Sequence, residues 1–474
     1  MSATGQPLHL HPDRLFSPEP AQRAIARRLY AQVAGLPIVS PHGHTDPAWF
    51  AANAPFANAT ELLLVPDHYV FRMLYSQGID LDELGIPRAD GSRAAVDPRQ
   101  AWRLFARNFH LFRGTPSSLW LNHVFHEVFG LRLRLDAGTA DHYYDTITAA
   151  LQDEAFRPRA LFERFGIEVL ATTEGPLDAL AHHQAIRDSG WGGRVITAYR
   201  PDEVVDPEHE AFAGALQRLG EISGEDVYTW DGYLRAHRQR RAFFKSMGAT
   251  STDHGHESAL TADLPRAEAE RLFAKILKGG FSRQEAALFR GQVLTEMAAM
   301  SLDDGLVMQL HPGCHRNHNP GLFARHGRNV GADLPLTTDY MHALKPLLDR
   351  FGNEPGFSLV LFTLDESTYS RELAPMAGHY PCLYLGPAWW FHDSPEGMWR
   401  FREQTLSTAG FYNTVGFNDD TRAFLSIPAR HDVARRIDCA FLARLVAEHR
   451  LDEGEAAALA ADLAYHLPRR AYRL

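Results

Sequence analysis

Several features are scarce or absent in this sequence, and each absence excludes a class of protein. The 474 residues include only three cysteines, Cys314, Cys382 and Cys439, which are odd in number and form no CxxC pair. We therefore expect neither a disulfide framework nor a thiolate zinc site, and a reducing compartment fits best. No apolar run reaches the roughly 18 residues of a membrane span, and residues 1–32 lack the apolar core of a signal peptide. These absences predict a cytoplasmic protein that does not engage a membrane.

An excess of basic charge is also lacking. The 48 Lys and Arg residues are outnumbered by 58 Asp and Glu residues, which gives a formal net charge of −10. Proteins that bind nucleic acid through its phosphates need clustered basic side chains to displace counterions, so nucleic acid is not an expected partner. An acidic small molecule remains a possible ligand, because the arginines inside a site matter more to it than the net charge.

What the sequence does contain is a regular alternation of short apolar runs with polar clusters and longer helical stretches. This alternation is typical of strand–helix units with parallel strands. Eight such runs predict an α/β fold of the (β/α)8 TIM-barrel type. The eight predicted strands are residues 36–39, 167–171, 195–198, 249–252, 306–310, 359–362, 382–385 and 414–417.

The first and second predicted strands are separated by more than a hundred residues, far more than an ordinary strand–helix connection. Within this stretch, residues 98–109 and 117–129 carry apolar side chains at helical spacing. A helical insertion into the barrel is therefore predicted. The expected organisation is an N-terminal segment with the first strand at 1–50, the inserted helical subdomain at 51–160, the rest of the barrel at 161–428 and closing helices at 429–474.

Polar side chains with catalytic potential follow the predicted strands, and barrel enzymes keep their sites at the C-terminal ends of their strands. A single polar strand end means little, because strands generally end in polar loops. Eight polar strand ends in one chain are harder to explain by this general tendency of strands alone. They include His42 with His44, Asp253 with His254, His311, and Asp420 with Arg422.

A metal site is the first chemistry that these strand ends suggest. His42 and His44 lie two residues apart on an extended segment, so both imidazoles can face one side. Two imidazoles and one carboxylate suit zinc or a related divalent ion, and Asp420 follows the last strand, which neighbours the first in a closed barrel. The spacing alone is weak, because the pairs His9/His11 and His254/His256 share it. Asp419 is the rival carboxylate, and a solvated turn is the simpler interpretation of both aspartates.

Other candidates have simpler structural explanations as well. Tyr69 has a phenol that could pass a proton between neighbouring oxygens, but Asp67 could equally cap a helix that buries Tyr69. Arginine suits bidentate binding of a carboxylate. Cys314 has no identifiable activating base and is taken as structural. The arginines that follow predicted strands are Arg200, Arg316 and Arg422.

Taken together, these segments resemble the uronate isomerase (glucuronate isomerase) family of the amidohydrolase superfamily, over nearly the whole chain. The resemblance rests on the order of several motifs. These are HGH at 42–44, DHYVFR at 67–72, TTEGPLDALAHH at 172–183, YRPD at 199–202, DHG at 253–255, QLHPGCHRNHN at 309–319, AWWFHD at 388–393, DDTRAF at 419–424 and RH at 430–431.

The resemblance implies roles for individual residues. His42, His44 and Asp420 match the ligands of a single divalent metal ion, for which zinc is expected and manganese or another divalent ion is the alternative. Tyr69 and Arg422 match catalytic residues that act beside the C1, C2 and C3 oxygens of the substrate, and Asp420 also matches the catalytic base. The residues that match the remaining substrate-binding positions are His68, Arg200, His311 and Trp389, with Trp390 as the alternative to Trp389.

The implied reaction interconverts D-glucuronate with D-fructuronate, and D-galacturonate with D-tagaturonate, by proton transfer through a cis-enediol. No nicotinamide is required, and no Gly-rich dinucleotide loop follows any predicted strand. The sequence departs from the family pattern at Ser40-Pro41, where an aspartate is common, and at TTEGP in residues 172–176, where TTDDP is common. Both departures bear on substrate preference more than on reaction type.

Two other functions remain open from the sequence. A mononuclear metal-dependent hydrolase or decarboxylase would use the same scaffold with a metal-activated water. A non-catalytic protein that binds sugar acids would show no turnover, although it would usually carry an export signal. The preference between glucuronate and galacturonate, the metal, and assembly into a homo-oligomer also stay open.

Overall fold

Seven parallel strands form a curled sheet at the centre of the structure, a computed structural model that describes residues 5–474. Every pairing within this sheet is parallel, and the strands follow one another in chain order. This topology agrees with the predicted TIM-type barrel. The strands are β1 (Ile38–Ser40), β2 (Ile167–Glu174), β3 (Arg194–Tyr199), β4 (Ser251–His254), β5 (Val307–Leu310), β8 (Leu359–Leu361) and β9 (Leu383–Leu385).

The eighth predicted strand, residues 414–417, contributes only one parallel bridge, from Leu385 to Thr414. Gly416 has a φ of 79°, which is incompatible with an extended strand, so the ladder stops there. A Cβ at this glycine would lie 2.6 Å from the carbonyl oxygen of Leu463, because the C-terminal helices pack directly on it. Close helix packing therefore replaces strand pairing at this position.

Strand bounds also differ from the predictions in a way that matters for the site. β4 begins two residues later than predicted, so Asp253 and His254 lie inside the strand and are fixed by its pairing with β5. β2 extends to Glu174, three residues beyond its predicted end. The polar clusters at these two ends are thus parts of the sheet and not of flexible loops.

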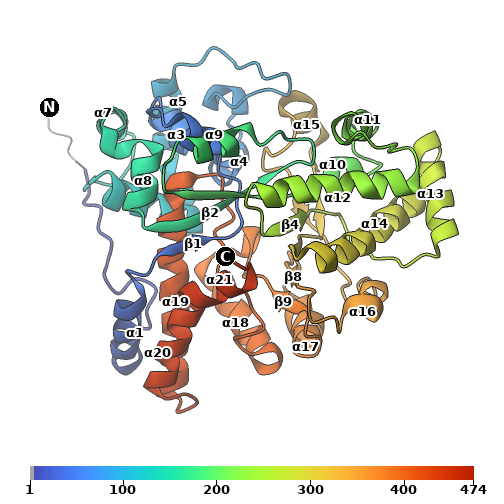
Figure 1. The fold of residues 1–474 in the computed structure, drawn as a ribbon. Helices are drawn as coiled ribbons and strands as arrows, with labels where there is room; N and C mark the ends of the chain where they lie inside the picture. The colour runs from blue at the N-terminus through green and yellow to red at the C-terminus, as the bar shows by residue number, and fades with distance from the viewer. Residues whose placement is uncertain (1–4) are drawn as a thin grey trace.

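The long stretch between β1 and β2 is helical, as predicted. Figure 1 shows its blue and teal helices grouped beside β1 and β2, away from the green and yellow helices α12, α13 and α14. The predicted helix at 98–109 is observed as α5, and that at 117–129 as α6 followed by a π-helical turn. The α-helices of this stretch are α2 (Pro47–Ala52), α3 (Ala59–Leu63), α4 (His68–Tyr75), α5 (Pro98–Arg107), α6 (Pro116–His123), α7 (Ala140–Ala150) and α8 (Pro158–Arg164).

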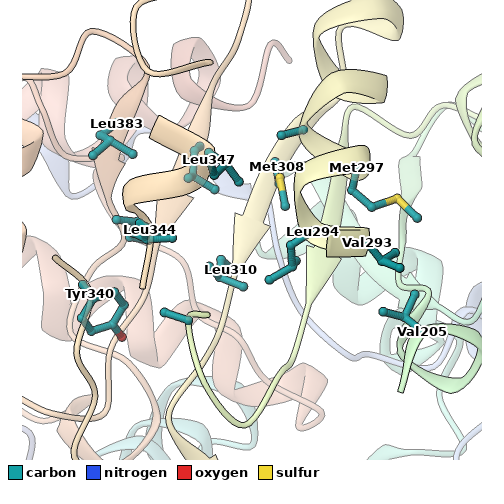
Figure 2. Packing of buried hydrophobic residues seen from close by; sticks show 14 of the residues in the cluster. Val205, Val293, Leu294, Met297, Met308, Leu310, Tyr340, Leu344, Leu347 and Leu383 are labelled. Atoms are coloured by element: carbon teal, nitrogen blue, oxygen red, sulfur yellow. The ribbon is translucent and has the colours of Figure 1, made fainter. Parts of the chain in front are cut away.

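Helices that follow the strands cover the outside of the sheet. Figure 2 shows Leu294 and Met297 of one of these, α14, near the buried β5 side chain Met308, with Leu344 and Leu347 beside the sheet as well. The helices are α9 (Ala181–Asp188), α10 (Asp202–Val205), α11 (Phe212–Ser223), α12 (Trp230–Ser246), α13 (Arg266–Lys278), α14 (Arg283–Asp304), α15 (Pro320–His326), α16 (Lys345–Phe351), α17 (Ala374–Ala377) and α18 (Pro395–Ala409). A small antiparallel hairpin, β6 (Cys314–His315) with β7 (Leu334–Pro335), follows β5.

The chain ends in three helices, α19 (Ile427–Ala447), α20 (Glu453–Ala461) and α21 (Leu467–Ala471), and begins with α1 (Pro20–Val33), which packs on α19. Tyr472 is fully buried, donates to Gln309 of β5 at 2.9 Å and accepts from Asn418 at the same distance. The C-terminus thereby joins β5 to the segment that replaces the eighth strand. Within the described residues, no helix is both long and apolar enough to cross a bilayer.

Candidate active site

The C-terminal ends of the strands open into a cavity of about 900 Å³. Every residue to which the sequence assigned a role lines this cavity. The strand ends, the start of α4 and the loops after β5 all contribute to its wall. The residues in question are His42, His44, His68, Tyr69, Arg200, His311, Trp389, Asp420 and Arg422.

His42, His44 and Asp420 meet at the floor of this cavity. The backbone N–H of His44 donates to the carbonyl oxygen of Thr421 at 3.1 Å, which joins the segment after β1 to the segment that contains Asp420. Oδ1 of Asp420 lies 3.5 Å from Nε2 of His42 and 3.3 Å from Nε2 of His44. The three side chains therefore lie close together at one end of the barrel.

The donor set fits a divalent metal ion. Ligand bonds of about 2.0–2.1 Å in a tetrahedral arrangement place two ligand atoms about 3.3 Å apart, which matches the two separations above. Oδ1 of Asp420 is buried and has no hydrogen-bond partner within residues 5–474. Burial lowers the pKa of His44 to about 4 despite the neighbouring Asp420, so the imidazole is neutral. A buried carboxylate oxygen left without a partner in this way suits a bound cation.

His311 is a further candidate ligand that the sequence assigned to the substrate. Ligand atoms of His42, His311 and Asp420 all lie within 4.8 Å of one another. The His311 ring stacks on His42 at 4.7 Å, and its buried Nε2 has no partner among the described residues. His42 and Asp420 are common to both possible sets. His44 completes the set predicted from the sequence and lies 3.3 Å from Oδ1 of Asp420, whereas His311 completes the group of mutually close ligand atoms.

Asp253 holds His311 in place. Nδ1 of His311 lies 2.6 Å from Oδ1 of Asp253, which can only accept, so Nδ1 carries the proton. Nη1 of Arg200 donates to Oδ2 of Asp253 at 2.9 Å, and Nε of Arg200 donates to Asp202 at 2.8 Å. Burial alone would raise the pKa of Asp253, but Arg200 and His311 outweigh it and hold that pKa well below its ordinary value. The pairing was not predicted, although the DHG motif marked its position.

The three arginines named from the sequence differ in their pairing. Arg200 is bound by two aspartates, and Arg316 donates to Asp333 at 3.0 Å. Arg422 forms no ion pair with any described side chain, and burial lowers its pKa while Asp420 partly offsets the effect. It also borders a smaller cavity of about 320 Å³ that adjoins the first. Arg422 is therefore the guanidinium most available to oxygens of a ligand.

Tyr69 reaches the cavity from α4. Asp67 caps this helix by accepting from the backbone N–H of Tyr69 at 2.9 Å, as the simpler interpretation of the sequence proposed. The Tyr69 ring stacks on His68 at 4.6 Å and meets Trp120 edge-on at 5.7 Å. Burial raises the pKa of the Tyr69 phenol above its ordinary value, so the hydroxyl is protonated. Asp67 thus caps α4 while Tyr69 lines the cavity, so the two interpretations of this segment are compatible.

The two tryptophans at 389 and 390 have distinct surroundings. The indole N–H of Trp389 donates to Oδ2 of Asp420, which makes this side chain a support for the carboxylate. Trp390 has a φ of 51°, an uncommon value for a bulky residue, and its buried indole nitrogen has no partner in the described chain. Arg316 lies over the Trp390 ring at 5.7 Å. Trp390 is therefore the better candidate for direct contact with a ligand.

His9 and His11 are exposed, as predicted, whereas His254 and His256 are buried, and a ring nitrogen of His254 lies 3.1 Å from the hydroxyl of Thr252. Burial raises the pKa of Cys314 to about 12, which leaves its thiol inert at neutral pH.

Comparisons with known proteins agree with one another. A family model described as glucuronate isomerase matches residues 20–472. A uronate isomerase from Xanthomonas campestris pv. campestris is 77% identical over 468 residues, which cover 99% of each chain. The crystal structure of a glucuronate isomerase from Caulobacter crescentus has a TM-score of 0.98 at 66% identity and covers 99% of this chain and 98% of that one. A uronate isomerase from Thermotoga maritima has a TM-score of 0.91 at 26% identity and covers 98% and 99%.

Proposed function

The chain belongs to the glucuronate isomerase family, and from this premise we propose that its cavity isomerises hexuronates with one divalent metal ion held by His42, His44 and Asp420. The protein is an aldose–ketose isomerase that acts on a small sugar acid. The observation that carries the metal assignment is the buried Oδ1 of Asp420, which faces two imidazole nitrogens at 3.3 and 3.5 Å without a hydrogen bond. Zinc is the expected ion.

A bound divalent ion would supply positive charge beside Asp420 and a coordination position for substrate oxygens. Asp420 would take the proton from C2 of the open-chain aldehyde, and the electrons of that bond would form a double bond between C1 and C2. Tyr69 would give its hydroxyl proton to O1 and regain a proton from O2. The proton on Asp420 would then return to C1, which leaves a ketone at C2.

The surrounding residues support this division of roles. Arg422 has no acidic partner in residues 5–474, so it is free to bind O2 and O3 and to stabilise negative charge on O2 as it develops. Arg200, fixed between Asp202 and Asp253, and His311, fixed by Asp253, present rigid groups to the substrate. His68 and Trp390 complete the wall around Tyr69, and Trp389 holds Asp420 in place.

The proton-transfer route is tested with D-glucuronate and D-galacturonate in deuterated water, with zinc or manganese supplied. We expect a keto product with deuterium at C1, because a proton on a carboxyl group exchanges with solvent. Conversion of neither sugar would contradict the proposed reaction, and the fraction of product with deuterium at C1 measures how far the proton on Asp420 exchanges with solvent before it returns. The ratio of kcat/KM for the two sugars measures the substrate preference.

A matched pair of variants on α4 tests the role of Tyr69. Tyr69→Phe should lower kcat by about 10²- to 10⁴-fold, the usual contribution of a positioned proton donor. Tyr75→Phe is the control, because Tyr75 lies on the same helix but is 37% exposed and does not line the cavity. Similar losses in both variants would contradict the assignment.

A further inference from the structure

The RH pair at 430–431 belongs to the motifs of the sequence, yet the reaction above gives it no role. Arg430 is fully buried in the first turn of α19. Its Nε donates to Ser426 at 3.1 Å, and its Nη1 donates to Asp393 and to the carbonyl oxygen of Asp419, the latter at 3.3 Å. A cation at this end of a helix opposes the helix dipole, and its burial is costly, so packing alone does not explain it.

The guanidinium of Arg430 lies directly behind the proposed proton donor. Its central carbon is 3.5 Å from the centre of the Trp120 ring and 5.1 Å from the centre of the Tyr69 ring. Tyr69 lines the cavity, whereas Arg430, Trp120 and Asp393 do not. Arg430 therefore lies outside the substrate space, on the far side of the lining residue Tyr69, and it also donates to the backbone carbonyl of Asp419.

We propose that Arg430 is a positioning residue for Tyr69, which fixes its ring and stabilises negative charge on its oxygen while the proton passes between the two substrate oxygens. This role rests on the proposed function of Tyr69. In its ionised form Asp393, the ion-pair partner of Arg430, balances the cation and limits how far it favours the phenolate. Burial raises the pKa of Asp393 to about 7, so this form predominates above that pH. The pair thus sets the acidity of Tyr69 from the side remote from the cavity.

Several charged groups surround Tyr69, on its own helix and on other elements, and they shift its pKa in opposite directions. Burial makes the largest contribution to its raised pKa, Arg430 lowers that pKa, and the nearby carboxylates raise it. At about 5 Å and an effective dielectric constant of about 20, one unit charge changes a neighbouring pKa by about two units. The groups around Tyr69 are Arg430 of α19, Asp393 before α18, Asp420, and Asp67, His68 and Arg72 in and before α4.

The opposite signs give a test that a merely structural role would not pass. A polyfluorinated tyrosine, whose phenol ionises nearer neutral pH, is placed at position 69, and its ionisation is followed by fluorine NMR against pH. Arg430→Gln should raise the phenol pKa by one unit or more, and Asp393→Asn should lower it by a similar amount. The double variant should return close to the parent value, because both charges are gone.

Matched controls separate charge from packing. Arg430→Lys keeps the cation and should restore most of the shift. Arg436→Gln removes another buried arginine of α19, which lies 4.1 Å from the Tyr30 ring and pairs with Asp432, and it should leave the Tyr69 pKa unchanged.

Shifts of the same sign in Arg430→Gln and Asp393→Asn, or no shift in either folded variant, would overturn the proposal. If Arg430→Gln does not fold, Asp393→Asn and the charge-neutral double variant still decide the matter. The titration needs no turnover, so a failure of the proposed reaction is distinguishable from a failure of this inference.

Discussion

Asp253 and Asp420 both lie next to histidines at the C-terminal end of the barrel strands, but their oxygens are used differently. Asp253 is fully buried, and its two oxygens are occupied by His311 at 2.6 Å and Arg200 at 2.9 Å. Within residues 5–474, Asp420 receives one hydrogen bond, from Trp389, while its Oδ1 faces two imidazoles with no hydrogen bond. We call Asp253 the saturated carboxylate, because both of its oxygens have hydrogen-bond partners, and this carboxylate positions other groups. We call Asp420 the open carboxylate, because its Oδ1 remains available for binding and for proton transfer.

An open buried carboxylate is unfavourable in the free protein, because burial of an unpaired charge costs several kcal/mol or more. Asp420 also has a φ of 37°, in the left-handed region that non-glycine residues seldom adopt. Unpaired atoms and backbone strain at one residue are typical of functional sites. Asp253 has neither feature, so the contrast separates binding groups from supporting groups at the same end of one barrel.

The largest expected effect comes from replacing the open carboxylate. Asp420→Asn keeps the shape but removes both the ligand charge and the base, so kcat for hexuronates should fall by about 10⁴-fold, and bound metal should be lost. Metal content by mass spectrometry and steady-state kinetics measure the two effects. Asp419→Asn is the control, because Oδ2 of Asp419 is already bound to His431 at 3.0 Å. An equal loss in Asp419→Asn would favour the rival ligand.

Replacing the saturated carboxylate should mainly affect stability. Asp253→Asn leaves Arg200 and His311 with unpaired buried groups, so the free energy of unfolding should fall by about 3–5 kcal/mol. Activity should fall by about 10- to 100-fold through misplacement of His311. Chemical denaturation measures the first effect. Asp202→Asn, at the outer end of the same chain of ion pairs, should cost less, since its side chain is 24% exposed.

This contrast also marks what the sequence could predict. His42, His44 and Asp420 were predictable together, because parallel strands present their C-terminal ends at one rim. The pairing of Asp253 with Arg200, and the approach of Arg430 to Tyr69, depend on side chains that lie far apart in the chain. Gly416 was likewise invisible as a strand breaker, because its φ is imposed by the packing of the C-terminal helices. The spacing of motifs along the sequence predicts which side chains lie at the C-terminal ends of the strands, whereas tertiary packing determines which of them form pairs.

Glu174 is a further acidic side chain that can be compared with Asp253 and Asp420. Its Oε2 accepts from Thr197, and it lies in the cavity wall with a side chain only 10% exposed. Burial raises its pKa to about 7, while hydrogen bonds from Thr172 and Thr197 oppose this. The folded state therefore holds this proton more tightly than the unfolded chain, whose Glu pKa is about 4.3.

The sign of the resulting pH dependence follows directly. Stability should be greatest below the unfolded pKa and should decrease as the pH rises to about 7, by up to about 4 kcal/mol from this group. Glu174→Gln should remove this decrease, which denaturation curves between pH 5 and pH 8 measure. A wild-type and a Gln variant with parallel pH profiles would show that Glu174 ionises normally and belongs with the saturated carboxylates.

The smallest expected effect comes from removing the hydrogen bond that Trp389 donates to Asp420. Trp389→Phe removes the only hydrogen bond that Asp420 receives from side chains of residues 5–474, and a bond to a charged group contributes about 1.5–3 kcal/mol. We expect kcat to fall by at least about tenfold with little change in KM, because the carboxylate loses its orientation and not its charge. Trp390→Phe is the matched comparison: its indole nitrogen has no partner to lose, but its ring borders the cavity, so KM should change more than kcat. If the two variants exchange these patterns, Trp389 contacts the substrate directly, and Asp420 is held open by the metal alone.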